Sequence, residues 1–194
     1  MKAHKIPLLS VPEYIIQEQE NHTKYEYHNG KIFALAGGTL HHGLLCGNIY
    51  AELRSHLKTK KSECKPFTSE IKLRIKTRNS FVYPDAMMIC GKIETSQQDK
   101  NAVTNPILVV EVLSKSTANY DRGDKFFLYR QIPSLREYVL ISQDKPQVDV
   151  FYKKQNTDLW QITRFEGLEN AILLQSLNLK IAMSDLYFDI NLKK

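Results

Sequence analysis

The run ILVVEVL, at residues 107–113, limits what this chain can fold into more than any other segment. Its apolar residues follow one another without the alternation of a half-exposed strand, so we expect a strand that is covered on both faces. Glu111 stands inside this run. An ionised carboxylate in an apolar strand is costly unless a cation or hydrogen bonds compensate it. Glu111 therefore needs a partner, which is either a lysine or arginine in a structural ion pair or a bound metal ion.

Three longer segments are expected to be helices. The first covers residues 10–20 and begins with a serine as N-cap. The second covers about residues 40–61, where leucine or isoleucine recurs at every fourth position. The third begins near Ser116 or Thr117 and ends at about residue 131, before a proline.

The remaining apolar segments are expected to be strands. Residues 24–38 read as a β-hairpin, because Asn29-Gly30 favours a two-residue turn with positive φ. Residues 71–76 alternate apolar with basic side chains, which predicts a half-buried strand with its basic side chains pointing outward. A polar loop is expected at residues 91–105. Further strands are expected at 81–90, 136–142, 147–153, 159–165 and from 171, followed by a short helix at 184–187. This order predicts an α/β (α+β) fold, a mixed sheet with helices on its faces.

Length and composition indicate one globular domain covering residues 1–194. No apolar run approaches the roughly 18 residues of a transmembrane helix, and the N-terminal segment lacks the features of a signal peptide. Cys46, Cys64 and Cys90 form no CxxC pair, which argues against a zinc knuckle and a disulfide framework. We therefore expect three reduced thiols and a cytoplasmic location.

The positive charge is concentrated in one segment of the chain. There are 27 Lys+Arg against 21 Asp+Glu, a net charge of +6. Nine of the basic residues lie between Arg54 and Arg78, where only Glu63 and Glu70 oppose them. Such a local positive field suits a polyanion, most obviously nucleic acid. The alternative is a solvated face that keeps the protein soluble.

A second carboxylate precedes Glu111. Asp85 follows a proline in the expected strand 81–90, and this strand is a plausible neighbour of 107–113. Pairing of the two strands would let Asp85 and Glu111 point to the same side. Mg²⁺ or Mn²⁺ takes carboxylate, water and phosphate oxygens as ligands, and such an ion can activate water beside a phosphodiester.

These segments together resemble a known protein family. The chain resembles the Uma-two family of restriction-endonuclease-like proteins, which belongs to the PD-(D/E)XK nuclease superfamily, over roughly residues 12–190. The resemblance implies a restriction-endonuclease-like mixed sheet flanked by helices, with an N-terminal hairpin and extra C-terminal strands. It rests on YEYHNGKIFALAGG (25–38), the nearby His41-His42, YPDAMMICG (83–91), NPILVVEVLSKST (105–117) and NYDRGDKFFLYRQIPSLREYVLIS (119–142).

The resemblance assigns roles to three residues. Asp85 takes the PD position and Glu111 the (D/E) position, both as metal ligands. Leu113 stands where the superfamily's simplest form has lysine, and the resemblance implies that Lys125 on the following helix replaces it. Lys125 would orient the attacking water or stabilise negative charge in the transition state. A surface ion pair of Lys125 with an aspartate four residues earlier is the alternative.

The sequence does not decide the roles of several other residues. Lys115 is a rival of Lys125, although many relatives have proline there. Glu26 matches a glutamate of the family hairpin, and an exposed strand residue is its alternative role. His42 is either a contact near the site or a structural histidine, and Glu70 is a further carboxylate. Phosphate contacts are expected from the basic strand, namely from Lys72, Arg74 and Lys76.

The preferred function is a Mg²⁺-dependent endodeoxyribonuclease that hydrolyses DNA phosphodiester bonds with an activated water. DNA is then the partner, no membrane is involved, and a homodimer would place two sites on two strands. A catalytically inactive nucleic-acid-binding module of the same fold is the first alternative. An oligomerising module whose carboxylates form ion pairs is the second.

Overall fold

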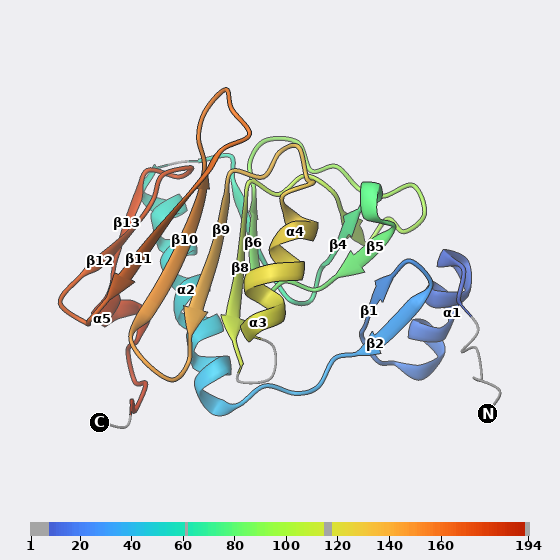
Figure 1. Cartoon of the computed structure of the whole chain (residues 1–194), viewed down its shortest axis with the longest axis horizontal. Coiled ribbons are helices and arrows are strands. Elements are labelled where there is room, and N and C mark those ends of the chain that lie inside the picture. Colours follow the sequence, from blue (N-terminus) through green and yellow to red (C-terminus); the bar gives the residue numbers. More distant parts are fainter. Residues whose placement is uncertain (1–7, 61, 115–117, 193–194) are drawn as a thin grey trace.

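The structure is a computed structural model that describes residues 8–60, 62–114 and 118–192 (Figure 1). The helical segments are α1 (Val11–Asn21), α2 (Leu40–Lys60), η1 (Lys76–Arg78), α3 (Ala118–Tyr120), η2 (Asp121–Lys125), α4 (Phe126–Tyr129) and α5 (Met183–Leu186). The strands are β1 (Tyr25–His28), β2 (Lys31–Ala34), β3 (Lys65–Thr68), β4 (Lys72–Ile75), β5 (Ser80–Val82), β6 (Ala86–Ile89), β7 (Ala102–Val103), β8 (Leu108–Leu113), β9 (Glu137–Ser142), β10 (Gln147–Lys153), β11 (Trp160–Glu166), β12 (Ala171–Leu174) and β13 (Leu179–Ala182).

The larger sheet has the strand order β11-β10-β9-β8-β6-β3. β8 and β9 run parallel while the other neighbours run antiparallel, so the sheet is mixed, as expected. α2, β12, β13 and α5 pack against one face, and α4 packs against the other (Figure 1). Every residue of β8 is buried, which confirms the expectation of a strand covered on both faces.

The helices follow the hydropathy pattern closely. Leu45, Ile49 and Leu53 of α2 are fully buried against the larger sheet, which confirms the expected apolar face. The Ser10 side chain caps α1, and the Glu13 carboxylate accepts a hydrogen bond from the Ser10 N–H in return. α3, η2 and α4 follow one another without a break, and η2 is a π-type segment. The expected start of this helix at residues 115–117 lies outside the described residues.

The smaller sheet has the strand order β2-β1-β5-β4-β7. Its hairpin β1–β2 turns at Asn29 and Gly30, which both have positive φ, as the Asn-Gly pair predicted. The short strand β7 lies within residues 91–105, which were expected to form a loop, and pairs in parallel with β4. The smaller sheet carries the N-terminal hairpin at one end of the molecule (Figure 1).

The chain crosses from the smaller sheet to the larger one between β5 and β6. The expectation of one continuous strand over 81–90 is therefore wrong. β5 ends at Val82 in the smaller sheet and β6 begins at Ala86 in the larger one. Pro84 has no N–H to donate to a strand ladder, so pairing stops there. The crossing leaves Asp85 at the junction of the two sheets.

The expectation that the basic side chains of strand 71–76 point outward is wrong for two of the three residues. The relative exposed areas of Lys72 and Arg74 are only 8% and 6%. Lys72 Nζ lies 2.6 Å from Glu18 Oε2 of α1 and also contacts the Asp99 carboxylate. The strand is buried on both sides because α1 and the segment that contains Asp99 bring acidic side chains over it.

The expectation of three reduced thiols is also wrong. Cys64 precedes β3 and Cys90 follows β6, and a disulfide joins them. The antiparallel register explains the contact, because Lys65 pairs with Ile89 and the next pair along the ladder is Cys64 with Cys90. Cys46 is a free thiol. Within the described residues, no helix is long and apolar enough to span a membrane.

Candidate active site

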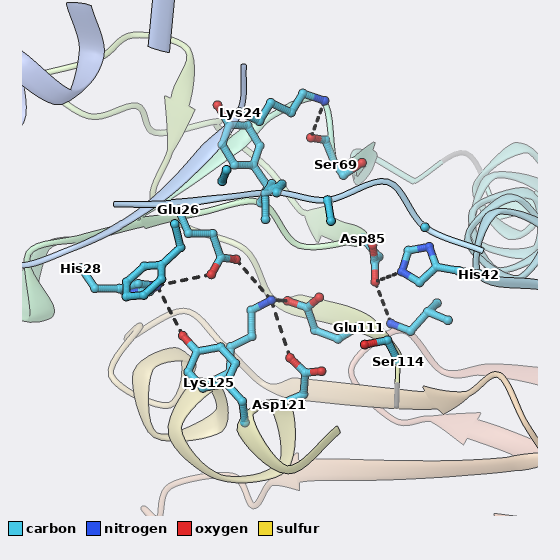
Figure 2. Close-up of a pocket in the computed structure, with 18 of the residues that line it drawn as sticks. Lys24, Glu26, His28, His42, Ser69, Asp85, Glu111, Ser114, Asp121 and Lys125 are labelled. Carbon is cyan, nitrogen blue, oxygen red and sulfur yellow. Dashed lines mark hydrogen bonds and ion pairs between the residues drawn. The ribbon is translucent and has the colours of Figure 1, made fainter. Parts of the chain in front are cut away.

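A cavity of about 1610 Å³ lies where the hairpin, the start of α2, the end of β8 and the helix after it come together. Figure 2 shows part of its lining, including Glu26, Asp85, Glu111 and Lys125. The cavity is acidic at its centre, and we call it the acidic pocket. Its carboxylates belong to Glu26, Asp85, Glu111, Asp121 and Asp124.

Glu111 is held by two side chains of the following helix. Lys125 Nζ lies 2.8 Å from Glu111 Oε1. Tyr129 Oη donates a hydrogen bond of 2.5 Å to the same oxygen. Both partners are buried, and their spacing of four residues places them on one side of the helix. The partner that a buried glutamate requires is thus supplied from α4 and η2.

Lys125 is the centre of a cluster of carboxylates. Its Nζ lies 3.3 Å from Glu26 Oε1 and 3.7 Å from Asp121 Oδ1, besides its contact with Glu111 (Figure 2). All four side chains are buried. Three carboxylates therefore share one ammonium group in a region that excludes most water, and the local charge is negative even before Asp85 is counted.

Burial and neighbouring charges shift the pKa values of this cluster. The pKa of Glu111 is raised to about 8: burial raises it most, Lys125 lowers it, and the nearby Asp85 and Asp121 raise it. Burial lowers the pKa of Lys125, but the surrounding carboxylates outweigh burial and the net shift is upward. The lysine therefore stays charged, whereas Glu111 readily takes up a proton when no other cation is near.

Glu26 and His28 of the smaller sheet form a hydrogen-bonded chain with Tyr120 of α3, and this chain lies beside Lys125. Glu26 Oε2 lies 3.3 Å from Nε2 of His28, and Tyr120 Oη lies 3.3 Å from the same nitrogen. Burial raises the pKa of Glu26, but Lys125 and His28 lower it more, so the net shift is downward. Glu26 is therefore a buried carboxylate that keeps its charge, which decides against the exposed role considered for it.

Asp85 reaches the acidic pocket from the junction of the two sheets. Its Oδ2 accepts a hydrogen bond of 2.7 Å from the Val112 N–H and lies 3.2 Å from His42 Nε2. Ala86 pairs with Val110 across β6 and β8, so the same register extended by one residue sets Asp85 opposite Glu111. The strand pairing that the sequence predicted thus places Asp85 and Glu111 on neighbouring segments that line one cavity.

His42 and Cys46, which are on the first turns of α2, lie beside Asp85 in the cavity. The hydrogen bond to Asp85 raises the pKa of His42 and outweighs burial, which lowers it; the charge of Asp85 adds to the rise. Cys46 Sγ lies 3.5 Å from His42 Nδ1. The ligand atoms of His42, Cys46 and Asp85 all lie within 4.8 Å of one another, a group that could hold a metal ion.

The structure brings some of the expected residues together and leaves others apart. Asp85, Glu111 and Lys125 line one cavity, and their catalytic roles stay predictions. Glu70 does not line it, because its side chain is 74% exposed and pairs with Lys24 at 2.6 Å. Lys115 lies outside the described residues.

The basic segment does not face the acidic pocket as a whole. Lys58 stands 16 residues after His42 on α2, which separates them by about 24 Å. Lys76 is exposed on η1 and does not line the cavity. Of the expected phosphate contacts, Lys72 and Arg74 are engaged in buried interactions, with Arg74 donating to the Ser80 carbonyl.

Sequence reasoning missed some residues that line or support the acidic pocket. Tyr129 stands four residues after Lys125, but this spacing does not predict its hydrogen bond to Glu111. Cys46 was considered only as a thiol. Besides Lys125, the lysine and arginine residues that line the cavity are Lys24 and Lys31 of the hairpin and Arg78 of η1. Arg78 ends the basic segment, but no local pattern marks Lys24 and Lys31, because these residues meet only in the folded chain.

Comparison with known proteins agrees with this architecture. The chain is 32% identical to the uncharacterized protein slr1290 of Synechocystis sp. strain PCC 6803 over 93% of its length and 92% of the relative. It is 36% identical to sll1609 of the same organism over 84% of its length and 90% of that relative. A crystal structure from Anabaena variabilis, described as a putative nuclease belonging to DUF820, superposes with a TM-score of 0.73 at 16% identity. That match covers 92% of this chain and 97% of the other, and it shows that the two share a fold.

One sequence family accounts for nearly the whole chain. Residues 11–184 match the Uma2 family, which is described as "Putative restriction endonuclease". The matched region includes both sheets and every residue of the acidic pocket. The expected resemblance is thereby confirmed: the chain belongs to the Uma2 family.

Proposed function

We propose that this protein is a metal-dependent endonuclease that hydrolyses DNA phosphodiester bonds in the acidic pocket. The observation that carries the proposal is the convergence of Glu26, Glu111 and Asp121 around Lys125, with Asp85 lining the same cavity. Such a cluster is costly for folding alone, because buried like charges repel. Such costly clusters are typical of functional sites, and a site that binds a divalent cation and a phosphate would use these carboxylates.

The donor atoms fit a hard divalent cation. Glu26, Asp85 and Glu111 offer carboxylate oxygens, which Mg²⁺ and Mn²⁺ prefer. Glu26 Oε1 is buried and accepts no hydrogen bond from the described part of the chain, although Lys125 lies nearby. Asp85 and Glu111 would hold the ion. When bound, it would lower the pKa of a water ligand and neutralise charge on the phosphate.

The protein's own groups would orient this chemistry. The Val112 N–H holds Oδ2 of Asp85 and the Tyr129 hydroxyl holds Oε1 of Glu111. Both carboxylates are therefore positioned before a ligand binds. Lys125 stays protonated beside Glu111. Its ammonium group would orient the attacking water or stabilise the negative charge that builds up on the phosphate.

DNA is the proposed substrate, and the cations of the cavity are its proposed phosphate contacts. Lys24, Lys31 and Arg78 line the cavity around the acidic centre. Lysine and arginine bind phosphate oxygens without reading sequence. These three residues would take over the role that the sequence suggested for Lys72 and Arg74. Lys72 is paired with Glu18 in a buried contact, and the Arg74 guanidinium is hydrogen-bonded to Asn79.

The test is incubation of the protein with supercoiled plasmid DNA in Mg²⁺, in Mn²⁺ and in EDTA. The wild type is expected to nick the plasmid only with a divalent ion, and Asp85→Asn and Glu111→Gln should abolish nicking. Glu70→Gln is the matched control, because this carboxylate lies at the surface outside the acidic pocket. Cleavage that persists in Glu111→Gln would overturn the site. DNA binding without cleavage under any of these conditions would favour the inactive binding module.

A further inference from the structure

His42 and Cys46 form a group of donor atoms at the edge of the acidic pocket that the proposed nuclease chemistry does not use. The two residues are one helical turn apart on α2, so their side chains share a face. Both line the cavity together with Asp85. Figure 2 shows the His42 ring pointing at the Asp85 carboxylate.

The geometry of this group suits a tightly held ion. His42 Nε2 lies 3.2 Å from Asp85 Oδ2, Cys46 Sγ lies 3.5 Å from His42 Nδ1, and the ligand atoms of the three residues fall within 4.8 Å of one another. Asp85 is held in place by the Val112 N–H. Since α2 and the β-sheet junction are each fixed by packing, two rigid elements present the donors.

The chemistry of the donors differs from that of the acidic pocket. Glu26 and Glu111 offer only hard oxygen atoms, whereas this group offers one imidazole nitrogen, one sulfur and one oxygen. Nitrogen and thiolate donors select Zn²⁺ and similar ions over Mg²⁺. Three protein ligands leave the fourth tetrahedral position for water or another ligand from the cavity.

We propose that His42, Cys46 and Asp85 bind a thiophilic divalent cation, Zn²⁺ or an ion of similar chemistry, and that this ion inhibits the nuclease. Binding releases the thiol proton of Cys46 to solvent, together with the second ring proton of His42 when the imidazole is protonated. The sulfur and the freed ring nitrogen each donate an electron pair to the ion, and no oxidation is involved. Inhibition follows because Asp85 belongs to both sites. A carboxylate drawn toward His42 and Cys46 is less available to Mg²⁺ opposite Glu111.

The binding part of this proposal stands apart from the proposed nuclease function, and the inhibitory part rests on it. The first experiment therefore measures binding alone. Co²⁺ is titrated into the protein without reductant, so that Cys64 and Cys90 stay joined. A thiolate-to-Co²⁺ absorption band is expected to appear and to be displaced by Zn²⁺ but not by Mg²⁺.

Variants identify the ligands. Cys46→Ser should remove the absorption band, and His42→Gln should weaken Co²⁺ binding by about tenfold or more. His41→Gln is the matched control, because His41 is the preceding residue on α2 and does not line the cavity; it should bind Co²⁺ like the wild type. Absence of the band in the wild type, or a band of full strength in Cys46→Ser, would overturn the site.

The second experiment measures inhibition. Plasmid cleavage in Mg²⁺ is followed while Zn²⁺ is added at concentrations that saturate the Co²⁺ site in competition. The wild type should lose cleavage, whereas Cys46→Ser should need at least about tenfold more Zn²⁺ for the same loss. Equal inhibition of the two proteins would overturn the inhibitory role. A protein that never cleaves DNA but binds Co²⁺ through Cys46 would refute the nuclease and its inhibition while leaving the metal site established.

Discussion

The Tyr129 hydroxyl donates a hydrogen bond of 2.5 Å to Oε1 of Glu111, the same oxygen that faces Lys125 at 2.8 Å. One carboxylate oxygen thus receives both of these contacts from a single helix. Because α4 packs on the sheet that contains Glu111, the position of this carboxylate depends on the docking of that helix. The arrangement couples the stability of the protein to the geometry of its acidic pocket.

Tyr129→Phe keeps the ring and removes this hydrogen bond. We expect the free energy of unfolding to fall by about 1–3 kcal/mol, because a buried oxygen of Glu111 loses a hydrogen-bond donor. Urea unfolding monitored by circular dichroism measures the change. Tyr152→Phe, a half-buried tyrosine of β10 outside the cavity, should change stability by less than about 0.5 kcal/mol. Equal effects of the two substitutions would show that the Tyr129 hydroxyl contributes nothing specific.

Lys125→Met leaves three buried carboxylates without their ammonium group. The expected loss of stability is about 3–5 kcal/mol, as for the removal of one partner from a buried ion pair. Mg²⁺ should recover more stability in this variant than in the wild type, since the ion replaces the missing charge. Thermal unfolding with and without Mg²⁺ measures both effects. Lys24→Met is the control, because its ion pair with Glu70 lies at the surface and contributes only about 0–1 kcal/mol. A Tm of Lys125→Met close to that of Lys24→Met would contradict the central role of Lys125.

Lys31→Ala is expected to weaken DNA binding and to reduce the salt slope of binding by about 1, because Lys31 lines the acidic pocket and its charge is exposed. Lys72→Met should instead lower stability and leave the salt slope unchanged, since Lys72 is held by Glu18 and Asp99. Fluorescence anisotropy at several salt concentrations distinguishes the two. Lys58→Ala, a substitution at the far end of α2, serves as the control. A smaller slope for Lys72→Met than for Lys31→Ala would restore the phosphate contact first expected of that strand.

The pKa of His42 is expected to lie above its ordinary value of 6.5, because the hydrogen bond to the Asp85 carboxylate stabilises the protonated imidazole. A raised pKa in the folded state means that the interaction stabilises the protein fully below pH 6.5 and that this contribution is lost as pH rises through the folded-state pKa. NMR titration of the imidazole signals measures the pKa directly. Asp85→Asn should bring it down, whereas Asp144→Asn, at an exposed position, should not. An unchanged titration in Asp85→Asn would refute the pairing.

Elements with a strong hydropathy pattern could be predicted from the sequence. Leu45, Ile49 and Leu53 recur at the spacing of one helical face and are all fully buried on α2. The apolar run around Glu111 forms a fully buried strand, and Lys125 is the cation that pairs with this glutamate. In these cases the local pattern and the packed structure require the same residues, so the prediction succeeds.

Several features that depend on which segments meet could not be predicted. The alternation of strand 71–76 identifies its two faces but not what covers each face, and α1 brings Glu18 to the side that was expected to be exposed. Cys64 and Cys90 are separated by 26 residues, and only the register of β3 and β6 shows that they are neighbours. Likewise, Cys46 and His42 can be identified as possible metal ligands only together with Asp85, which lies on another segment of the chain. The failures thus concern contacts between distant segments, where a local pattern carries no information.

The acidic pocket is divided between the two sheets, with Glu26 on the smaller one, Glu111 on the larger one and Lys125 in contact with both. Neither sheet alone contains a complete site. During refolding, hydrogen bonding within each sheet can finish before the sheets have docked. We therefore expect recovery of the pocket during refolding to report the docking of the two sheets and not the formation of β-structure within each sheet.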